Sequence, residues 1–127
     1  MIGLIHGFPA SDWHQARERA REILIQRARR RGGQTITYSD LVAQLNLPIE
    51  ASDPRLSFLL DEISTEEHSE GRGFLTVLVV HKFGDQMPGP GFFEMAERCG
   101  ANIIDREEFW SSSFAEVLTT WQRHPGD

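Results

Sequence analysis

The stretch that decides the fold is Gly71–Gly100, GRGFLTVLVVHKFGDQMPGPGFFEMAERCG. It opens with an apolar run, Phe74–Phe83, in which both sets of alternate residues are mostly apolar. That pattern is typical of a strand covered on both faces. Two Pro-Gly pairs then turn the chain, and apolar residues at helical spacing follow as far as Gly100. We therefore expect a strand, a loop and a helix in this stretch.

Four further segments carry apolar residues every three or four positions, which predicts four further helices. Their starts are marked by capping residues or by a proline at the first helical position. These expected starts are Ser11 or Asp12, Ser39, Ser52 or Asp53 before Pro54, and Asp105. A short strand is expected over Thr35–Tyr38, between the first two of these helices.

The order helix, short strand, two helices and strand is that of a winged-helix domain. Within it, TITYSDLVAQL (Thr35–Leu45) resembles the first strand and helix of the winged helix in alkyltransferase-like proteins, and the resemblance extends to about Lys82. The Pro-Cys-His-Arg motif of the active alkyltransferases is absent, so the resemblance does not imply alkyl transfer. We expect residues 1–127 to form a single α+β domain that is winged-helix-like, with two additional C-terminal helices.

The same Gly71–Gly100 core also resembles that of a group of small bacterial proteins, a resemblance that implies no particular activity. The single cysteine, Cys99, excludes an internal disulfide framework. The start of the chain has no Lys or Arg before a short apolar run, unlike a signal peptide, and no stretch reaches the ~18 apolar residues of a membrane span. These features predict a bacterial cytoplasmic protein without a membrane partner.

The charge of the chain is unevenly distributed. The net charge is −6, yet Met1–Arg31 carries seven Arg against three acidic residues, while the remainder carries six basic against sixteen acidic residues. One interpretation is a basic helix that folds against an acidic body. The other is that this Arg stripe meets nucleic acid or an acidic partner. The stripe comprises Arg17, Arg21, Arg27, Arg29, Arg30 and Arg31.

The expected third helix is acidic, which bears on nucleic-acid binding. In a winged helix this element enters the major groove. Here it carries Asp53, Asp61, Glu62, Glu66, Glu67 and Glu70 against only Arg55 and Arg72. Carboxylates beside phosphates are unfavourable, so any nucleic-acid contact is expected to use the Arg stripe instead.

The Pro-Gly loop does not fit a phosphate cradle. Such a cradle needs successive backbone N–H groups, and Pro88 and Pro90 have none. We expect an ordered turn, docked by the aromatic residues that follow it. As an alternative, an exposed loop here could be bound by a protein partner with an aromatic-lined groove. That partner loop comprises Met87, Pro88, Gly89, Pro90, Gly91 and Phe92.

Catalytic motifs are sparse. His81 closes the predicted strand four residues before Asp85, and the two could form an acid–base pair. Cys99 lies on an apolar helical face, which favours a structural role over a nucleophilic one. No zinc-binding spacing of His and Cys occurs, so neither a metal nor a cofactor is expected.

These observations favour a non-enzymatic binding module, with a protein partner preferred over nucleic acid. The alternative is a small hydrolase or nuclease that uses His81 and Asp85 as acid–base residues. An open pocket at His81 would favour the enzyme, and an exposed basic or aromatic patch would favour the binding module. The oligomeric state is left open.

Overall fold

The α+β class expected from the sequence is confirmed by the computed structural model, which describes residues 3–82, 84 and 86–123. Within these residues five α-helices and one 3-10 helix, η1, accompany four two-residue strands. The elements are β1 (Leu4–Ile5), β2 (Phe8–Pro9), α1 (Ala10–Ala28), β3 (Ile36–Thr37), α2 (Tyr38–Val42), α3 (Pro54–Ser69), η1 (Leu75–Leu78), β4 (Val79–Val80), α4 (Pro90–Arg98) and α5 (Arg106–Gln122).

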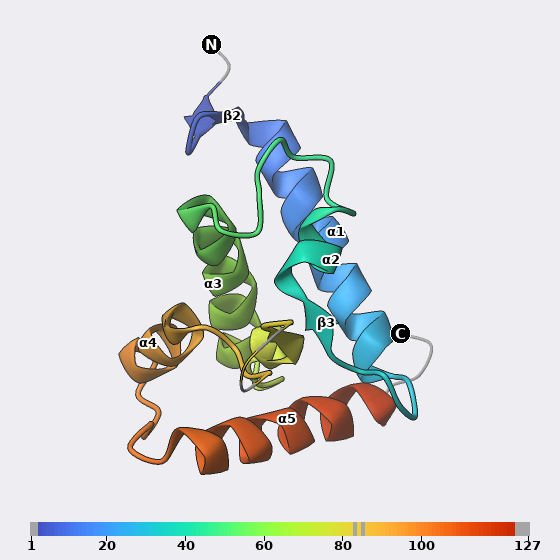
Figure 1. Cartoon of the computed structure of the whole chain (residues 1–127), viewed down its shortest axis with the longest axis vertical. Coiled ribbons are helices and arrows are strands. Elements are labelled where there is room, and N and C mark those ends of the chain that lie inside the picture. The colour runs from blue at the N-terminus through green and yellow to red at the C-terminus, as the bar shows by residue number, and fades with distance from the viewer. Residues whose placement is uncertain (1–2, 83, 85, 124–127) are drawn as a thin grey trace.

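The helices surround η1. Helices α1 and α3 lie side by side, α5 runs across one end of the molecule, and η1 contacts all three (Figure 1). The strands form two small sheets, β1 with β2 antiparallel and β3 with β4 parallel, with Ile36 opposite Val79 and Thr37 opposite Val80. Parallel strands need a long crossover, and α2 and α3 provide it. The crossover brings the start of α2 close to the loop that follows β4.

The long strand predicted over Phe74–Phe83 is wrong in length. Its burial on both sides is confirmed, since Phe74–Val80 is buried throughout, but Leu75–Leu78 form η1 and only Val79 and Val80 form a strand. Ser64 of α3 supplies part of the reason: its Oγ accepts a hydrogen bond from the amide of Thr76 at 3.0 Å. Periodicity cannot distinguish a short apolar strand from a buried helical turn when every side is covered.

Two of the predicted helix starts are confirmed and two are wrong. Asp53 and Asp105 cap α3 and α5, accepting from the amides of Arg55 at 2.9 Å and Glu108 at 3.1 Å. In contrast, α1 begins at Ala10 directly after β2 and has no side-chain cap. The short helix α2 begins at Tyr38 rather than after Ser39, because the hydroxyl of Thr37 accepts from the amide of Asp40 at 3.1 Å and the preceding strand stops there.

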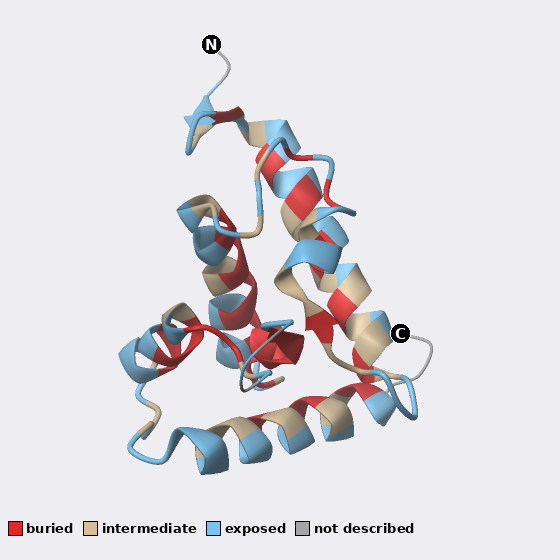
Figure 2. Ribbon diagram, in the orientation of Figure 1, coloured by how far each residue is buried: buried red, intermediate tan, exposed pale blue. Residues whose placement is uncertain are grey.

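One hydrophobic core extends from Phe8 to Trp121. Figure 2 shows the buried residues on the facing sides of α1 and α3 and on the side of α5 toward them. Trp13 and Leu24 of α1 and Leu59 of α3 are among its fully buried members. Cys99 is half-buried and packs against this core, as expected for a structural cysteine.

A buried carboxylate joins α1 to α3. Glu67 is 1% exposed, and its carboxylate accepts hydrogen bonds from Arg21 of α1 and from Arg72. Beside it, Arg21 binds Glu66 at 2.5 Å, and Arg17 binds Glu62 at 2.8 Å. The interpretation of a basic helix folded against an acidic body is therefore confirmed for Arg17 and Arg21.

We expect Glu67→Gln to lower the free energy of unfolding by about 1.5–3 kcal/mol, because it weakens two charge-assisted hydrogen bonds to a buried group. The matched control is Glu66→Gln, which alters a half-exposed ion pair of the same arginine and should cost less than about 1 kcal/mol. Urea unfolding followed by tryptophan fluorescence measures both. Equal losses for the two variants would contradict the role given to the buried carboxylate.

Candidate functional site

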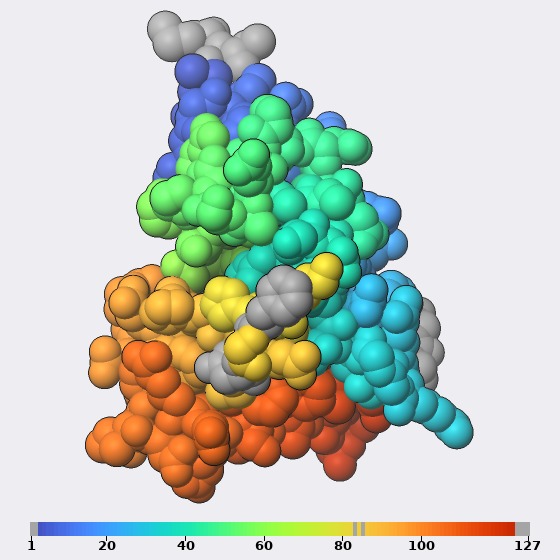
Figure 3. Space-filling model, in the orientation of Figure 1, coloured from blue at the N-terminus to red at the C-terminus, as the bar shows by residue number. Residues whose placement is uncertain are grey.

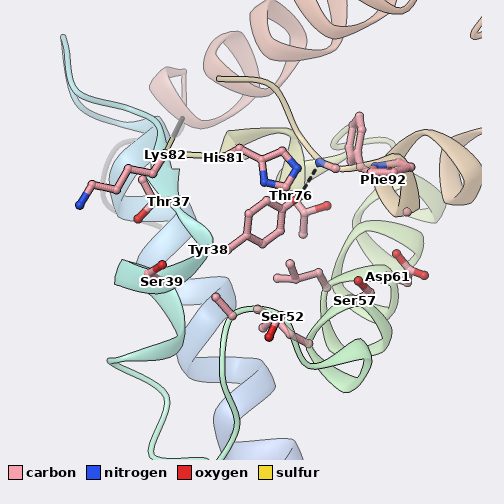
Figure 4. Close-up of a pocket in the computed structure, with 16 residues that line it drawn as sticks. Thr37, Tyr38, Ser39, Ser52, Ser57, Asp61, Thr76, His81, Lys82 and Phe92 are labelled. Carbon is pink, nitrogen blue, oxygen red and sulfur yellow. Dashed lines mark hydrogen bonds between the residues drawn. The ribbon is translucent and has the colours of Figure 1, made fainter. Parts of the chain in front are cut away.

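A cavity of about 370 Å³ opens between α2, α3 and the Pro-Gly loop. Its apolar surface includes Leu56, Leu60 and Phe92. Its polar groups come from separate parts of the chain and surround this apolar surface (Figure 4). They are Thr37, Tyr38, Ser39, Ser52, Ser57, Asp61, Thr76, His81 and Lys82.

Tyr38 ties the Pro-Gly loop to the start of α2. The amide of Gly89 donates a hydrogen bond to the Tyr38 hydroxyl at 2.7 Å (Figure 4). Burial raises the pKa of Tyr38 above its usual value, although this hydrogen bond acts in the opposite sense, so the hydroxyl stays protonated at neutral pH. The bond from Gly89 uses an oxygen lone pair and leaves the phenolic proton available for a ligand.

His81 shares this space with Tyr38. The two rings lie 5.1 Å apart, centre to centre, at an angle of 41°. A Cβ atom on Gly89 would lie 3.2 Å from His81 Nε2 and 3.4 Å from the Tyr38 hydroxyl. Glycine at position 89 therefore permits the backbone to approach both side chains, and neither has to move.

Asp61 of α3 is the carboxyl group of the cavity. Burial raises its pKa to about 6, against the opposing effect of Arg98, whose guanidinium lies 3.2 Å from the carboxylate. The nearby charge of Glu94 adds to the rise. A carboxyl that titrates near pH 6 can donate or accept a proton close to neutral pH, so Asp61 is an acid–base candidate.

The Pro-Gly loop is a wall of the cavity. The alternative of an exposed loop does not hold for Pro88, Gly89 and Phe92, which are buried, whereas Pro90 is exposed. The expected ordered turn is confirmed by two backbone hydrogen bonds. The amide of Phe92 donates to the carbonyl of Gly89 at 3.1 Å, and the amide of His81 donates to the carbonyl of Met87 at 3.0 Å. The Gly89 amide, the donor between the two prolines, is already bound to Tyr38. Whether Met87–Phe92 contact a partner stays a prediction.

The predicted acid–base pair of His81 and Asp85 stays a prediction, because Asp85 lies outside the described residues. His81 does line an open cavity, which is one of the conditions for an enzyme. Sequence reasoning missed Tyr38 and Asp61 as its neighbours. Both lie far from His81 along the chain, and no short motif links them.

The Arg stripe does not form one continuous exposed surface. Arg17 and Arg21 bind carboxylates of α3, and Arg27 donates to the carbonyl of Thr35 at 2.9 Å. Half-buried Arg29 lies 5.6 Å over the ring of Trp121, which leaves Arg30 and Arg31 as the exposed residues beyond α1. Glu62, Glu66 and Glu67 of α3 are neutralised by Arg17 and Arg21. Their charge is therefore a weaker argument against insertion of α3 into the DNA major groove than the sequence suggested.

Comparison with protein-family models, curated proteins and solved structures gives no match for this chain. In the part of the chain that the structure describes, no helix combines the length and the apolar character needed to cross a membrane. The same residues contain no group of three or more His, Cys, Asp or Glu placed to hold a metal ion. The case for function therefore rests on the cavity.

The raised pKa of Asp61 makes a prediction about pH. A carboxyl that binds its proton more tightly when folded makes the folded protein less stable as the pH rises from about 4 to 6, with no further change above that range. Asp61→Asn removes this contribution. The difference in unfolding free energy, variant minus wild type, should therefore increase between pH 4 and pH 6 in urea titrations. A difference that is constant or falls across this range would contradict the assignment.

Proposed function

We propose that the protein is a non-enzymatic binding module of the bacterial cytoplasm, and that its partner is a protein held at the cavity that Tyr38 and His81 line. The observation that carries this proposal is a concave site with an apolar floor and a few convergent polar groups, which is typical of binding pockets. The Gly89 bond to Tyr38 supports a preformed site. A preformed wall reduces the ordering cost of binding.

The chemistry of the cavity favours an aromatic side chain with a polar end. The rings of Tyr38 and His81 offer edges and faces to another ring, and the floor of Leu56, Leu60 and Phe92 offers apolar contact. The Tyr38 hydroxyl and the Asp61 carboxyl can meet a polar atom on that ring. Tyrosine and tryptophan combine these properties and dominate protein interfaces.

A protein partner is favoured over nucleic acid by the charges. The chain has a net charge of −6. Two residues of the Arg stripe, Arg17 and Arg21, form ion pairs with α3. Proteins that bind duplex DNA commonly make about 6–10 phosphate contacts, whereas Arg30 and Arg31 are the exposed members of the stripe. Nucleic-acid binding through these two residues would be weak and strongly salt-dependent.

The second candidate is the small hydrolase or nuclease. One observation favours it: Asp61, with its pKa near 6, and His81 line the same cavity. Nucleophilic catalysis also needs a nucleophile hydrogen-bonded to a base. Among the described residues, no hydrogen bond joins the His81 side chain to a serine, threonine or cysteine. We therefore place the enzyme second.

The proposal keeps the winged-helix-like interpretation of the fold. Its support is the element order α1, β3, α2, α3, η1 and β4, which apart from η1 follows the expected helix, strand, two helices and strand. In this interpretation α4 and α5 are the two additional C-terminal helices. The parallel pairing of β3 with β4 is a feature that the interpretation has to accommodate.

The cavity makes a binding prediction. N-acetyl-tyrosinamide and N-acetyl-tryptophanamide should cause saturable amide NMR shifts centred on Tyr38, Gly89 and Phe92. Gly89→Ala places a methyl group between His81 and Tyr38 and should weaken binding by about fivefold or more, roughly 1 kcal/mol. Gly32→Ala is the matched control, because Gly32 lies outside the cavity and its Cβ would meet no atom within 4 Å.

The same spectra test the alternatives. Shifts centred on the cavity with a short DNA duplex, and none with the aromatic amides, would contradict the protein-partner proposal. Equal effects of Gly89→Ala and Gly32→Ala would show that the aromatic probes bind elsewhere.

A further inference from the structure

A second, larger cavity of about 770 Å³ lies on the other side of the Pro-Gly loop, between this loop and the start of α5. Met87, Pro88, Phe93 and Trp110 give it an apolar floor. In Figure 3 the described residues of this loop, coloured yellow, lie on the face of the molecule between the α2 region and the region of α4 and α5. The loop therefore has a cavity on each side.

The rim of this second cavity is acidic. Asp105, Glu107 and Glu108 border it, against one guanidinium, Arg106, which lies 4.9 Å over the ring of Phe93. Asp105 caps α5, whereas Glu107 and Glu108 are exposed and make no ion pair with any described residue. The positive end of a helix dipole amounts to about half a charge, so the carboxylates outweigh it.

The two cavities are neighbours at the loop, because His81 and Pro90 line both. A partner chain whose side chain occupies the first cavity would therefore lie close to the second cavity, at His81 and Pro90. Residues a short distance along that chain would then pass the rim formed by Glu107 and Glu108. A floor of this kind suits apolar stems, and the rim suits positive charge.

We propose that the partner is an extended basic peptide segment. An aromatic side chain enters the first cavity, and an arginine or lysine that follows it in the segment lies over the second, with its stem on the half-buried Met87 and Trp110 and its charge beside Glu107 and Glu108. This inference rests on the function proposed above and adds the chemistry of the partner. The net charge of −6 agrees with a basic occupant.

Two synthetic peptides test the proposal. Acetyl-Tyr-Gly-Ser-Arg-Lys-amide carries the aromatic and basic groups, and acetyl-Tyr-Gly-Ser-Gln-Gln-amide carries the aromatic group alone. At low salt the basic peptide should bind about fivefold more tightly, and about 0.5 M salt should remove this preference. Glu107→Gln combined with Glu108→Gln should remove it too. Glu116→Gln, which alters an exposed carboxylate farther along α5, should not.

The outcomes separate the two proposals. Equal binding of both peptides to the wild-type protein, weakened by Gly89→Ala, overturns the basic segment and keeps the first cavity as a binding site. Binding of neither peptide overturns both. A preference that survives the change at Glu107 and Glu108 overturns their role. A last outcome concerns self-association, measured by sedimentation. If the protein self-associates, and if Arg30→Ala combined with Arg31→Ala abolishes the self-association and frees the second cavity, the occupant of that cavity is a second copy of this chain. The peptide proposal then fails.

Discussion

The cavity lined by Tyr38 and His81 depends on one hydrogen bond, from the amide of Gly89 to the hydroxyl of Tyr38. It joins the start of α2 to a loop that would otherwise have few backbone donors, because Pro88 and Pro90 lack N–H groups. The loop in turn separates two cavities and lines both. Because Gly89 has no side chain, Tyr38 and His81 approach the same point of the backbone. Preorganisation of this loop supports the binding role that we propose for the cavity.

Charged residues of α1 and α3 pair with one another across the two helices. Glu67 is buried between Arg21 and Arg72. Glu62 and Glu66 of α3 bind Arg17 and Arg21 of α1. Breaking such a buried pair costs far more than breaking an exposed one. The basic first helix is therefore best understood as a structural partner of α3. This leaves the opposite side of α3, where Asp61 and Ser57 line the cavity, available for function.

The sequence predicted local features better than contacts between distant residues. The caps at Asp53 and Asp105 and the double-sided burial of Phe74–Val80 could be predicted, since each depends on neighbouring residues. The 3-10 helix within that run could not, because it depends on packing from three helices. The hydrogen bond between Tyr38 and Gly89 and the raised pKa of Asp61 arise only when separate elements come together in the fold. Neither periodicity nor a short sequence motif could therefore predict them.

The central claim, that Tyr38 holds the Pro-Gly loop in place, is tested most directly by hydrogen exchange at the Gly89 amide. The account predicts slow exchange in the wild-type protein. In Tyr38→Phe, which removes only the hydroxyl, the Gly89 amide should exchange much faster while the amides of α3 keep their protection. Fast exchange of the Gly89 amide in the wild-type protein, or equal protection in the variant, would contradict the account.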